Sequence, residues 1–227
     1  MLGPWPAGSS PQWCWCHSSP SPWPSRLGDT CSPTERADLS RWMATRVLTA
    51  TTPLDCIVVC DDSEVAAFAR EHRSAVHWTP GLDLNRALAS AVESTRAMRF
   101  DRVVIAAGDL PFAHDLGSPE VLCGSALGPT DVLVVGDRHR DGTNVLSFST
   151  AHPLTPSYGP GSLQRHIADA RRSGLPVREV HDEALAWDVD TPEDLVPPSH
   201  LGPIPLVGPR VDMTDRPPLA TSRHDPP

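Results

Sequence analysis

The sequence predicts an α/β fold, a three-layer sandwich in which helices cover both faces of a mainly parallel sheet. Short apolar runs alternate with helical patterns along most of the chain, as they do where a helix connects two parallel strands. The apolar runs are continuous and do not alternate with polar residues, which is typical of strands buried on both faces.

Four segments have helical patterns. Ser32-Pro33-Thr34-Glu35 forms a capping box with proline at the first helical position, and it predicts a helix that continues to about Leu48. Apolar residues at helical spacing form the expected inner face of this helix: Leu39, Trp42, Met43 and Val47. Three further helices are expected over residues 63–72, 82–98 and 162–173.

Between these helices lie the predicted strands. Continuous apolar runs predict buried strands over 55–60, 102–107 and 131–135, and a further one over 144–148. Shorter strands are expected over 75–78 and near Val177 and Ala186.

Composition divides the chain into three parts. Residues 1–24 hold six prolines and four tryptophans and no charged side chain, so we expect them to lie outside the fold. Residues 198–227 are rich in proline and lack apolar periodicity, which predicts a disordered tail. The folded domain is therefore expected over residues 25–197.

Charge and composition narrow the range of partners. The formal net charge of −9 disfavours sequence-independent binding to nucleic acid or to an anionic membrane. All 19 basic residues are arginine, so contacts with phosphate fall to arginine, backbone N–H groups or a metal ion. There is no apolar run of membrane-spanning length and no signal-peptide pattern, and the six cysteines do not suggest a disulfide framework. We therefore expect a cytoplasmic protein.

Acidic residues follow two of the predicted strands. Asp109 follows the run 102–107, and Asp188 and Asp190 follow the strand expected near Ala186. Ligands of such sheets bind beyond the carboxyl ends of the strands, so Asp109 and Asp188 are candidates to meet in one crevice. Mg²⁺ takes oxygen ligands and commonly uses one or two carboxylates. The alternative is that Asp109 turns a loop and Asp188 is solvated.

Two other segments carry donors for an anion. The loop before Asn144 offers the Thr143 hydroxyl and backbone N–H groups, unless it is simply a hairpin turn with solvated charges. Gly159 and Gly161 precede Ser162 at a predicted helix start, where free N–H groups can bind an anion. Glycine and serine are also ordinary capping residues, so this motif by itself favours neither interpretation.

Several motifs, in a fixed order, resemble those of a known family. They are PGLDLN (80–85), AAGDLPF (106–112), RDGTNVLSF (140–148), YGPGSLQRHIADARRSGLPV (158–177) and WDVDTPEDL (187–195). With Ser25-Arg26-Leu27 they resemble the 2-phospho-L-lactate/phosphoenolpyruvate guanylyltransferase family of coenzyme F-420 biosynthesis, over roughly residues 25–197.

The resemblance implies a nucleotide-diphospho-sugar-transferase-like fold, related to that of the molybdenum-cofactor guanylyltransferases. It implies an enzyme that transfers GMP from GTP to phosphoenolpyruvate or 2-phospho-L-lactate and releases pyrophosphate. In this interpretation Asp109 and Asp188 hold Mg²⁺ and form the catalytic centre, and Thr143, Gly159 and Ser162 bind the acceptor. The nucleotide is expected to contact Arg26, Leu84, Asn85 and Gly108. Asp190 is expected to support the metal site or to cap the next helix, which begins at Thr191 and Pro192.

The N-terminal part departs from the family pattern. The family begins with a buried strand followed by a loop that carries lysines, whereas this chain matches only from Ser25 and has no lysine. We therefore expect the first strand to be missing or replaced. Two alternatives stay open: another nucleotidyltransferase or nucleotide-sugar transferase on the same fold, or a non-catalytic remnant of the family.

Overall fold

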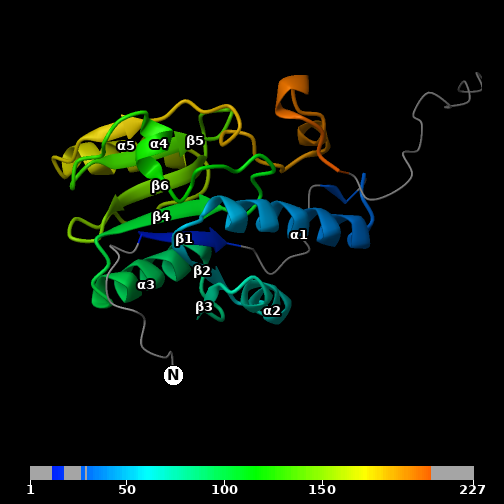
Figure 1. The fold of residues 1–227 in the computed structure, drawn as a ribbon, viewed down its shortest axis with the longest axis horizontal. Helices are drawn as coiled ribbons and strands as arrows, with labels where there is room; N and C mark the ends of the chain where they lie inside the picture. Colours follow the sequence, from blue (N-terminus) through cyan, green and yellow to red (C-terminus); the bar gives the residue numbers. More distant parts are fainter. Residues whose placement is uncertain (1–11, 18–26, 29, 206–227) are drawn as a thin grey trace, which may run out of the picture.

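The computed structural model describes residues 12–17, 27–28 and 30–205, with only the backbone described for 12–17 and 123. Seven strands form one sheet in the order β3-β2-β1-β4-β6-β5-β7 (Figure 1). The strands are β1 (Gln12–His17), β2 (Asp55–Cys60), β3 (Ala75–Trp78), β4 (Arg102–Ala107), β5 (Val132–Gly136), β6 (Thr143–Ser149) and β7 (Val177–Glu179). β6 runs antiparallel to β4 and β5, and the other neighbouring pairs are parallel, so the mainly parallel sheet is confirmed.

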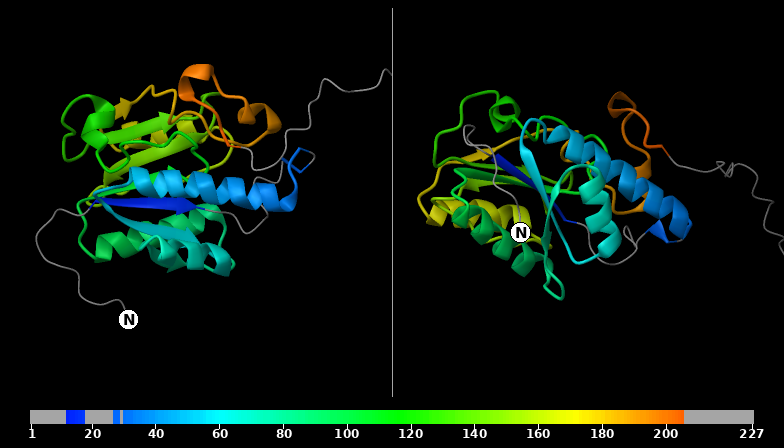
Figure 2. Two further views of the ribbon diagram at one scale, coloured as in Figure 1. Left: turned by 45° about the vertical axis from the view of Figure 1, so that its right-hand side comes forward. Right: turned by 60° about the horizontal axis from the view of Figure 1, so that its bottom comes forward.

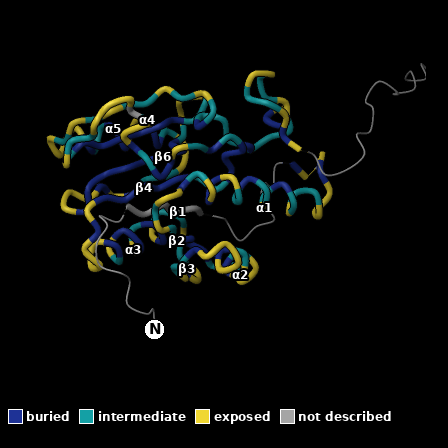
Figure 3. Tube along the Cα trace, viewed as in Figure 1, coloured by how far each residue is buried: buried dark blue, intermediate teal, exposed yellow. Residues whose placement is uncertain are grey.

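Helices cover both faces of the sheet. They are α1 (Pro33–Ala50), α2 (Ser63–Glu71), α3 (Leu84–Ala97), α4 (Pro119–Cys123) and α5 (Ser162–Arg172). On β4, Val103 and Ile105 pack in one apolar cluster with α3 and α5, while Val104 packs in the other with α1 and α2. Figure 2 shows the two helix pairs on opposite sides of the sheet, and Figure 3 shows buried positions along β4 and β6. The predicted three-layer sandwich is therefore confirmed.

The structure corrects the prediction for the N-terminal segment. Gln12–His17 forms β1, which pairs in parallel with β2 and β4, and Trp15 lies in register with both Ile57 and Ile105. The expectation that residues 1–24 lie outside the fold is therefore wrong for these six residues. The first strand was expected to be missing or replaced, and it is not missing, because β1 lies between β2 and β4. The average composition of residues 1–24 opposes a strand. The window QWCWCH within it is free of proline, however, and its tryptophans favour a strand. Residues 1–11 and 18–24 lie outside the described residues.

The predicted tail also begins too early. Residues 199–201 form a short 3₁₀ helix (η3, Ser199–Leu201), and Ile204 is buried in a third apolar cluster with Leu27, Met43 and Val189. Burial of the Ile204 side chain holds this stretch on the domain, although prolines flank it. Residues 206–227 lie outside the described part of the chain.

No strand forms near Ala186, where one was expected. The N–H groups of Leu185 and Ala186 bond to the Asp182 side chain (2.9 Å) and carbonyl (2.9 Å), which makes a turn. Aspartate competes with sheet pairing in this way because its short side chain reaches nearby backbone N–H groups. Among the described residues, none of the helices is both long and apolar enough to cross a membrane.

Candidate functional site

The candidate site lies beyond the carboxyl end of β4. The chain places β2 on one side of β1 and β4 on the other, so the strand order changes direction there, as it does at the ligand-binding crevice of open α/β sheets. Asp109 follows β4 by two residues. The segment 187–194 passes the same point, and Val189 donates its N–H to the Asp109 carbonyl (3.3 Å).

Three carboxylates meet at this point and form what we call the acidic cluster: Asp109, Asp188 and Asp190. One oxygen of each lies within 4.8 Å of the other two. Asp109 is only 7% exposed, and its Oδ1 is buried with no hydrogen-bond partner among the residues that the structure describes. The predicted meeting of Asp109 and Asp188 is thus observed, with Asp190 as a third member.

Burial and mutual repulsion make this cluster electrostatically unfavourable by itself. Burial, and then the charges of Asp188 and Asp190, raise the pKa of Asp109 well above its ordinary value. Burial, and then the charge of Asp190, raise the pKa of Asp188 to about 6. A buried oxygen without a partner beside two further carboxylates suits a divalent cation with a preference for oxygen ligands. The acidic cluster therefore fits such an ion.

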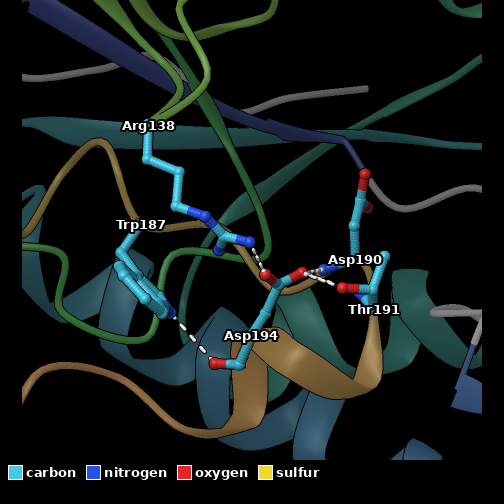
Figure 4. Close-up of polar contacts among 5 residues, drawn as sticks. All are labelled: Arg138, Trp187, Asp190, Thr191 and Asp194. Atoms are coloured by element: carbon cyan, nitrogen blue, oxygen red, sulfur yellow. Dashed lines mark hydrogen bonds and ion pairs between the residues drawn. The ribbon is translucent and has the colours of Figure 1, made fainter.

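The capping role expected for Asp190 belongs to Asp194. Asp194 is 2% exposed, and its Oδ2 accepts the N–H groups of Asp190 (2.8 Å) and Thr191 (2.7 Å) and the Thr191 hydroxyl (3.1 Å). It thereby caps the 3₁₀ helix η2 (Pro192–Leu195), which begins where a helix was predicted. Figure 4 shows the Asp190 side chain pointing away from Asp194. Thr191 and Asp194 have capping-box spacing, a signal that the sequence already contained.

A second polar group, the hydroxyl–imidazole network, consists of Thr143, Ser162 and His166. The Ser162 hydroxyl donates to Thr143 Oγ1 (3.2 Å), which lies 3.0 Å from His166 Nδ1. The N–H of Ser157 donates to His166 Nε2 (3.0 Å), so the neutral ring carries its proton on Nδ1 and donates it to Thr143. Burial, and then the nearby Arg165, lower the pKa of His166 to about 4, which keeps the ring uncharged.

The loop before α5 is fixed by side chains from two helices. The Asn85 amide, on α3, accepts the Tyr158 N–H (2.6 Å) and donates to the Tyr158 carbonyl (3.2 Å). The Arg165 guanidinium bonds to the carbonyls of Ser157 (2.7 Å) and Gly159 (3.3 Å). Gly159 has a φ of 112°, a conformation that favours glycine. Asn85, expected at the nucleotide, thus holds this loop.

The predicted anion site at the start of α5 is partly occupied by the protein itself. Gly161 donates its N–H to the Asp141 carboxylate (3.0 Å), and Leu163 donates to the Asp141 carbonyl (3.1 Å).

The remaining predicted nucleotide contacts are only partly described. Leu84 opens α3, and Gly108 precedes Asp109. Arg26 lies outside the described residues. Sequence reasoning did not assign roles to His166, Arg138, Trp187 or Asp194.

Comparison with known proteins agrees with this fold and identifies the family. A solved structure from Desulfovibrio desulfuricans G20, described as a nucleotide-diphospho-sugar transferase, superposes with a TM-score of 0.64 at 18% identity, covering 79% of this chain and 82% of that one. The likeness shows a shared fold, and the match to a guanylyltransferase family places the chain among the nucleotidyltransferases. More narrowly, residues 18–197 match the family described as guanylyl transferase CofC like, and the chain belongs to this family.

Relatives of this chain are named as guanylyltransferases of one particular kind. The chain is 33% identical over 176 residues to a phosphoenolpyruvate guanylyltransferase from Sphaerobacter thermophilus, covering 75% of this chain and 84% of that protein. It is 31% identical over 183 residues to a phosphoenolpyruvate guanylyltransferase from Chloroflexus aggregans, covering 75% and 88%. The resemblance of the sequence motifs to this family is therefore confirmed.

Proposed function

We propose that this chain transfers GMP from GTP to phosphoenolpyruvate or 2-phospho-L-lactate, releasing pyrophosphate, as a step of coenzyme F-420 biosynthesis. Family membership and the names of the relatives support the reaction class. The observation that carries the proposal is the acidic cluster, in which carboxylates from two distant segments converge beyond β4. In the reaction a bond forms between an acceptor phosphate oxygen and the α-phosphorus of GTP, and the bond from that phosphorus to pyrophosphate breaks.

Such a transfer needs no nucleophilic side chain, because the acceptor itself supplies the attacking oxygen. The protein has to position both substrates and offset their negative charge. Asp109, Asp188 and Asp190 would hold Mg²⁺, which when bound neutralises phosphate charge and orients the reacting groups.

The hydroxyl–imidazole network is suited to binding the acceptor. Thr143 Oγ1 accepts hydrogen bonds from both Ser162 and His166, so its own O–H proton is left to donate. A neutral His166 keeps that orientation over the whole pH range above its low pKa. Asn85 and Arg165 fix the loop that carries Gly159 beside this network, and Gly159 would lie next to the anionic acceptor.

Pyrophosphate release measures the proposed activity directly. The chain with GTP, Mg²⁺ and phosphoenolpyruvate or phospholactate should release pyrophosphate. Asp109→Asn and Asp188→Asn should each lower the rate by more than about 100-fold, because a lost ligand should cost more than a lost supporting contact. Asp101→Asn, at the opposite end of β4 and exposed, is the matched control and should keep the wild-type rate.

Unchanged release in either cluster variant would contradict the metal assignment. Faster release with another nucleotide than with GTP would favour a different nucleotidyltransferase or a nucleotide-sugar transferase on the same fold. A non-catalytic remnant would show no thermal shift with GTP, whereas a ligand at a hundred times its dissociation constant adds about 2.7 kcal/mol.

A further inference from the structure

Three residues outside the acidic cluster form a closed unit around the segment that carries two of its members. This unit, the Arg138 brace, consists of Arg138, Trp187 and Asp194. The Arg138 guanidinium carbon lies 4.5 Å from the centre of the Trp187 ring, and its Nη2 forms an ion pair with Asp194 Oδ1. Trp187 Nε1 donates to the Asp194 carbonyl (3.0 Å), which closes the ring of contacts (Figure 4).

The brace is well anchored and largely shielded from solvent. The side chains of Arg138 and Asp194 are 22% and 3% exposed, and the Arg138 N–H donates to the Ala186 carbonyl (2.8 Å). Burial works against a charged Asp194, but the N–H groups of Thr191 and Asp190 and the Arg138 guanidinium outweigh it and lower the pKa of Asp194. Removing the arginine would leave a buried carboxylate without its cation, which is strongly unfavourable.

The brace acts on both flanks of Asp188 and Asp190. Trp187 directly precedes Asp188, and Asp194 Oδ2 holds the N–H groups of Asp190 and Thr191. Between them, Val189 is fully buried in the third apolar cluster. The carboxylates of the cluster repel one another, so their spacing has to be imposed by the backbone that carries them.

We propose that Arg138 is a positioning residue for the acidic cluster. Acting through Asp194 and Trp187, it fixes the spacing of the Asp188 and Asp190 carboxylates and so sets the affinity of the site for a divalent cation. This inference rests on the proposed function, because it takes the acidic cluster as the cation site. In this proposal Arg138 acts without contacting the cation or the nucleotide.

Binding of Mn²⁺ alone to the full-length protein tests this, with free Mn²⁺ measured by electron paramagnetic resonance. Arg138→Gln should weaken Mn²⁺ binding by about 10–100-fold, as loss of a supporting contact at a metal site does. In the pyrophosphate assay the same variant should need correspondingly more Mn²⁺, with kcat at saturating Mn²⁺ close to that of the wild type. Arg138→Lys keeps the charge but lacks the planar fork, and should bind with intermediate affinity.

Arg140→Gln provides the matched control. Arg140 lies on the same loop, but its guanidinium pairs with Glu179 and its side chain is 52% exposed. This variant should bind Mn²⁺ as the wild type does. If the loss of any positive charge from the loop weakened binding, Arg140→Gln would weaken it as well.

Wild-type Mn²⁺ affinity in a folded Arg138→Gln variant would overturn the inference. Loss of kcat at saturating Mn²⁺ with unchanged affinity would also overturn it, because Arg138 would then act on the nucleotide. If Arg138→Gln does not fold, Arg138→Lys takes its place in the test. Wild-type Mn²⁺ affinity in Arg138→Lys would then overturn the inference. The failure of the proposed function is a separate result: Asp109→Asn would then bind Mn²⁺ as tightly as the wild type.

Discussion

The acidic cluster and the hydroxyl–imidazole network differ in how their polar groups interact. The groups of the cluster repel one another, whereas those of the network form hydrogen bonds with one another. In the cluster, three carboxylates lie together, and the buried Oδ1 of Asp109 has no hydrogen-bond partner among the described residues. In the network, Thr143, Ser162 and His166 are each at most 5% exposed and bond to one another. The first group brings like charges together and leaves a carboxylate oxygen without a partner, whereas the second is held together by hydrogen bonds between its own side chains.

This difference should make the two groups affect the stability of the fold differently. A buried network whose members hydrogen-bond to one another rigidifies its surroundings. A cluster of like charges destabilises the folded state until a counter-charge binds, so its stability should depend on metal and on pH. Substitutions in the two groups should therefore change stability in opposite directions.

The largest effect is expected from Asp188→Asn in the metal-free protein, which should become more stable. The folded-state pKa of Asp188 is raised from 3.8 to about 6, so the folded state binds more protons than the unfolded state between these values. The wild type therefore loses stability as the pH rises from about 4 to about 6. Asp188→Asn has no carboxyl group to ionise at this position, so its stability should not fall in the same way. Thermal unfolding in a chelator should show a higher Tm for the variant at neutral pH, by about 2–4 °C for each kcal/mol of relieved repulsion.

Adding Mn²⁺ should reverse that order. The wild type should gain Tm because the ion binds only the folded state, while Asp188→Asn should gain little. A variant less stable than the wild type at neutral pH without metal would show that the cluster is not repulsive.

His166→Phe, in the hydroxyl–imidazole network, should instead lower the stability of the folded state. The ring is retained, but Thr143 and the Ser157 N–H lose their buried partner, which should lower the free energy of unfolding by about 2–4 kcal/mol. Because the folded-state pKa of His166 is lowered from 6.5 to about 4, its contribution is present above pH 6.5 and is lost as the pH falls toward 4. Urea unfolding at several pH values measures both effects.

His166→Gln offers one donor and one acceptor and should lose less stability than His166→Phe. If both variants unfold at the wild-type urea concentration, the network contributes nothing to stability, and the contrast with the acidic cluster disappears.

Much of the fold was predictable because buried strands are continuous apolar runs. The strands 55–60, 75–78 and 102–107 have the predicted bounds. β1 was missed because six suitable residues lie within a proline-rich segment whose average composition opposes a strand. The strand expected near Ala186 failed because Asp182 takes the local N–H groups, an effect of one side chain that periodicity does not register.

The site was predictable to the extent that topology determines it. The rule that ligands bind beyond strand ends brought Asp109 and Asp188 together, although Asp188 follows a turn and not a strand. The capping spacing of Thr191 and Asp194 was visible in the sequence. The pairing of Arg138 with Asp194 was not, because it depends on how two distant loops pack. His166 has helical spacing with Leu163 and Ala170, which predicts an inward position but not a hydrogen-bond partner.

The smallest effect is expected outside the acidic cluster, in His114→Asn. His114, in the loop after Asp109, lies 3.1 Å from Asp182 in the turn before Asp188, and 3.2 Å from Asp115. The hydrogen bond with Asp182, and then that with Asp115, outweigh burial and raise the pKa of His114 from 6.5 to about 9. Its stabilisation is therefore complete below pH 6.5 and is lost as the pH rises through 9.

Because the His114 side chain is 41% exposed, the pair should contribute only about 0.2–1 kcal/mol. Thermal unfolding of His114→Asn should show a Tm lower than that of the wild type by at most about 4 °C near pH 6, with the difference gone above pH 9. His200→Asn, which removes a pair with Glu183 between two exposed side chains, is the control and should change Tm less. A Tm difference that persists unchanged above pH 9 would mean that His114 acts through packing and not through its charge.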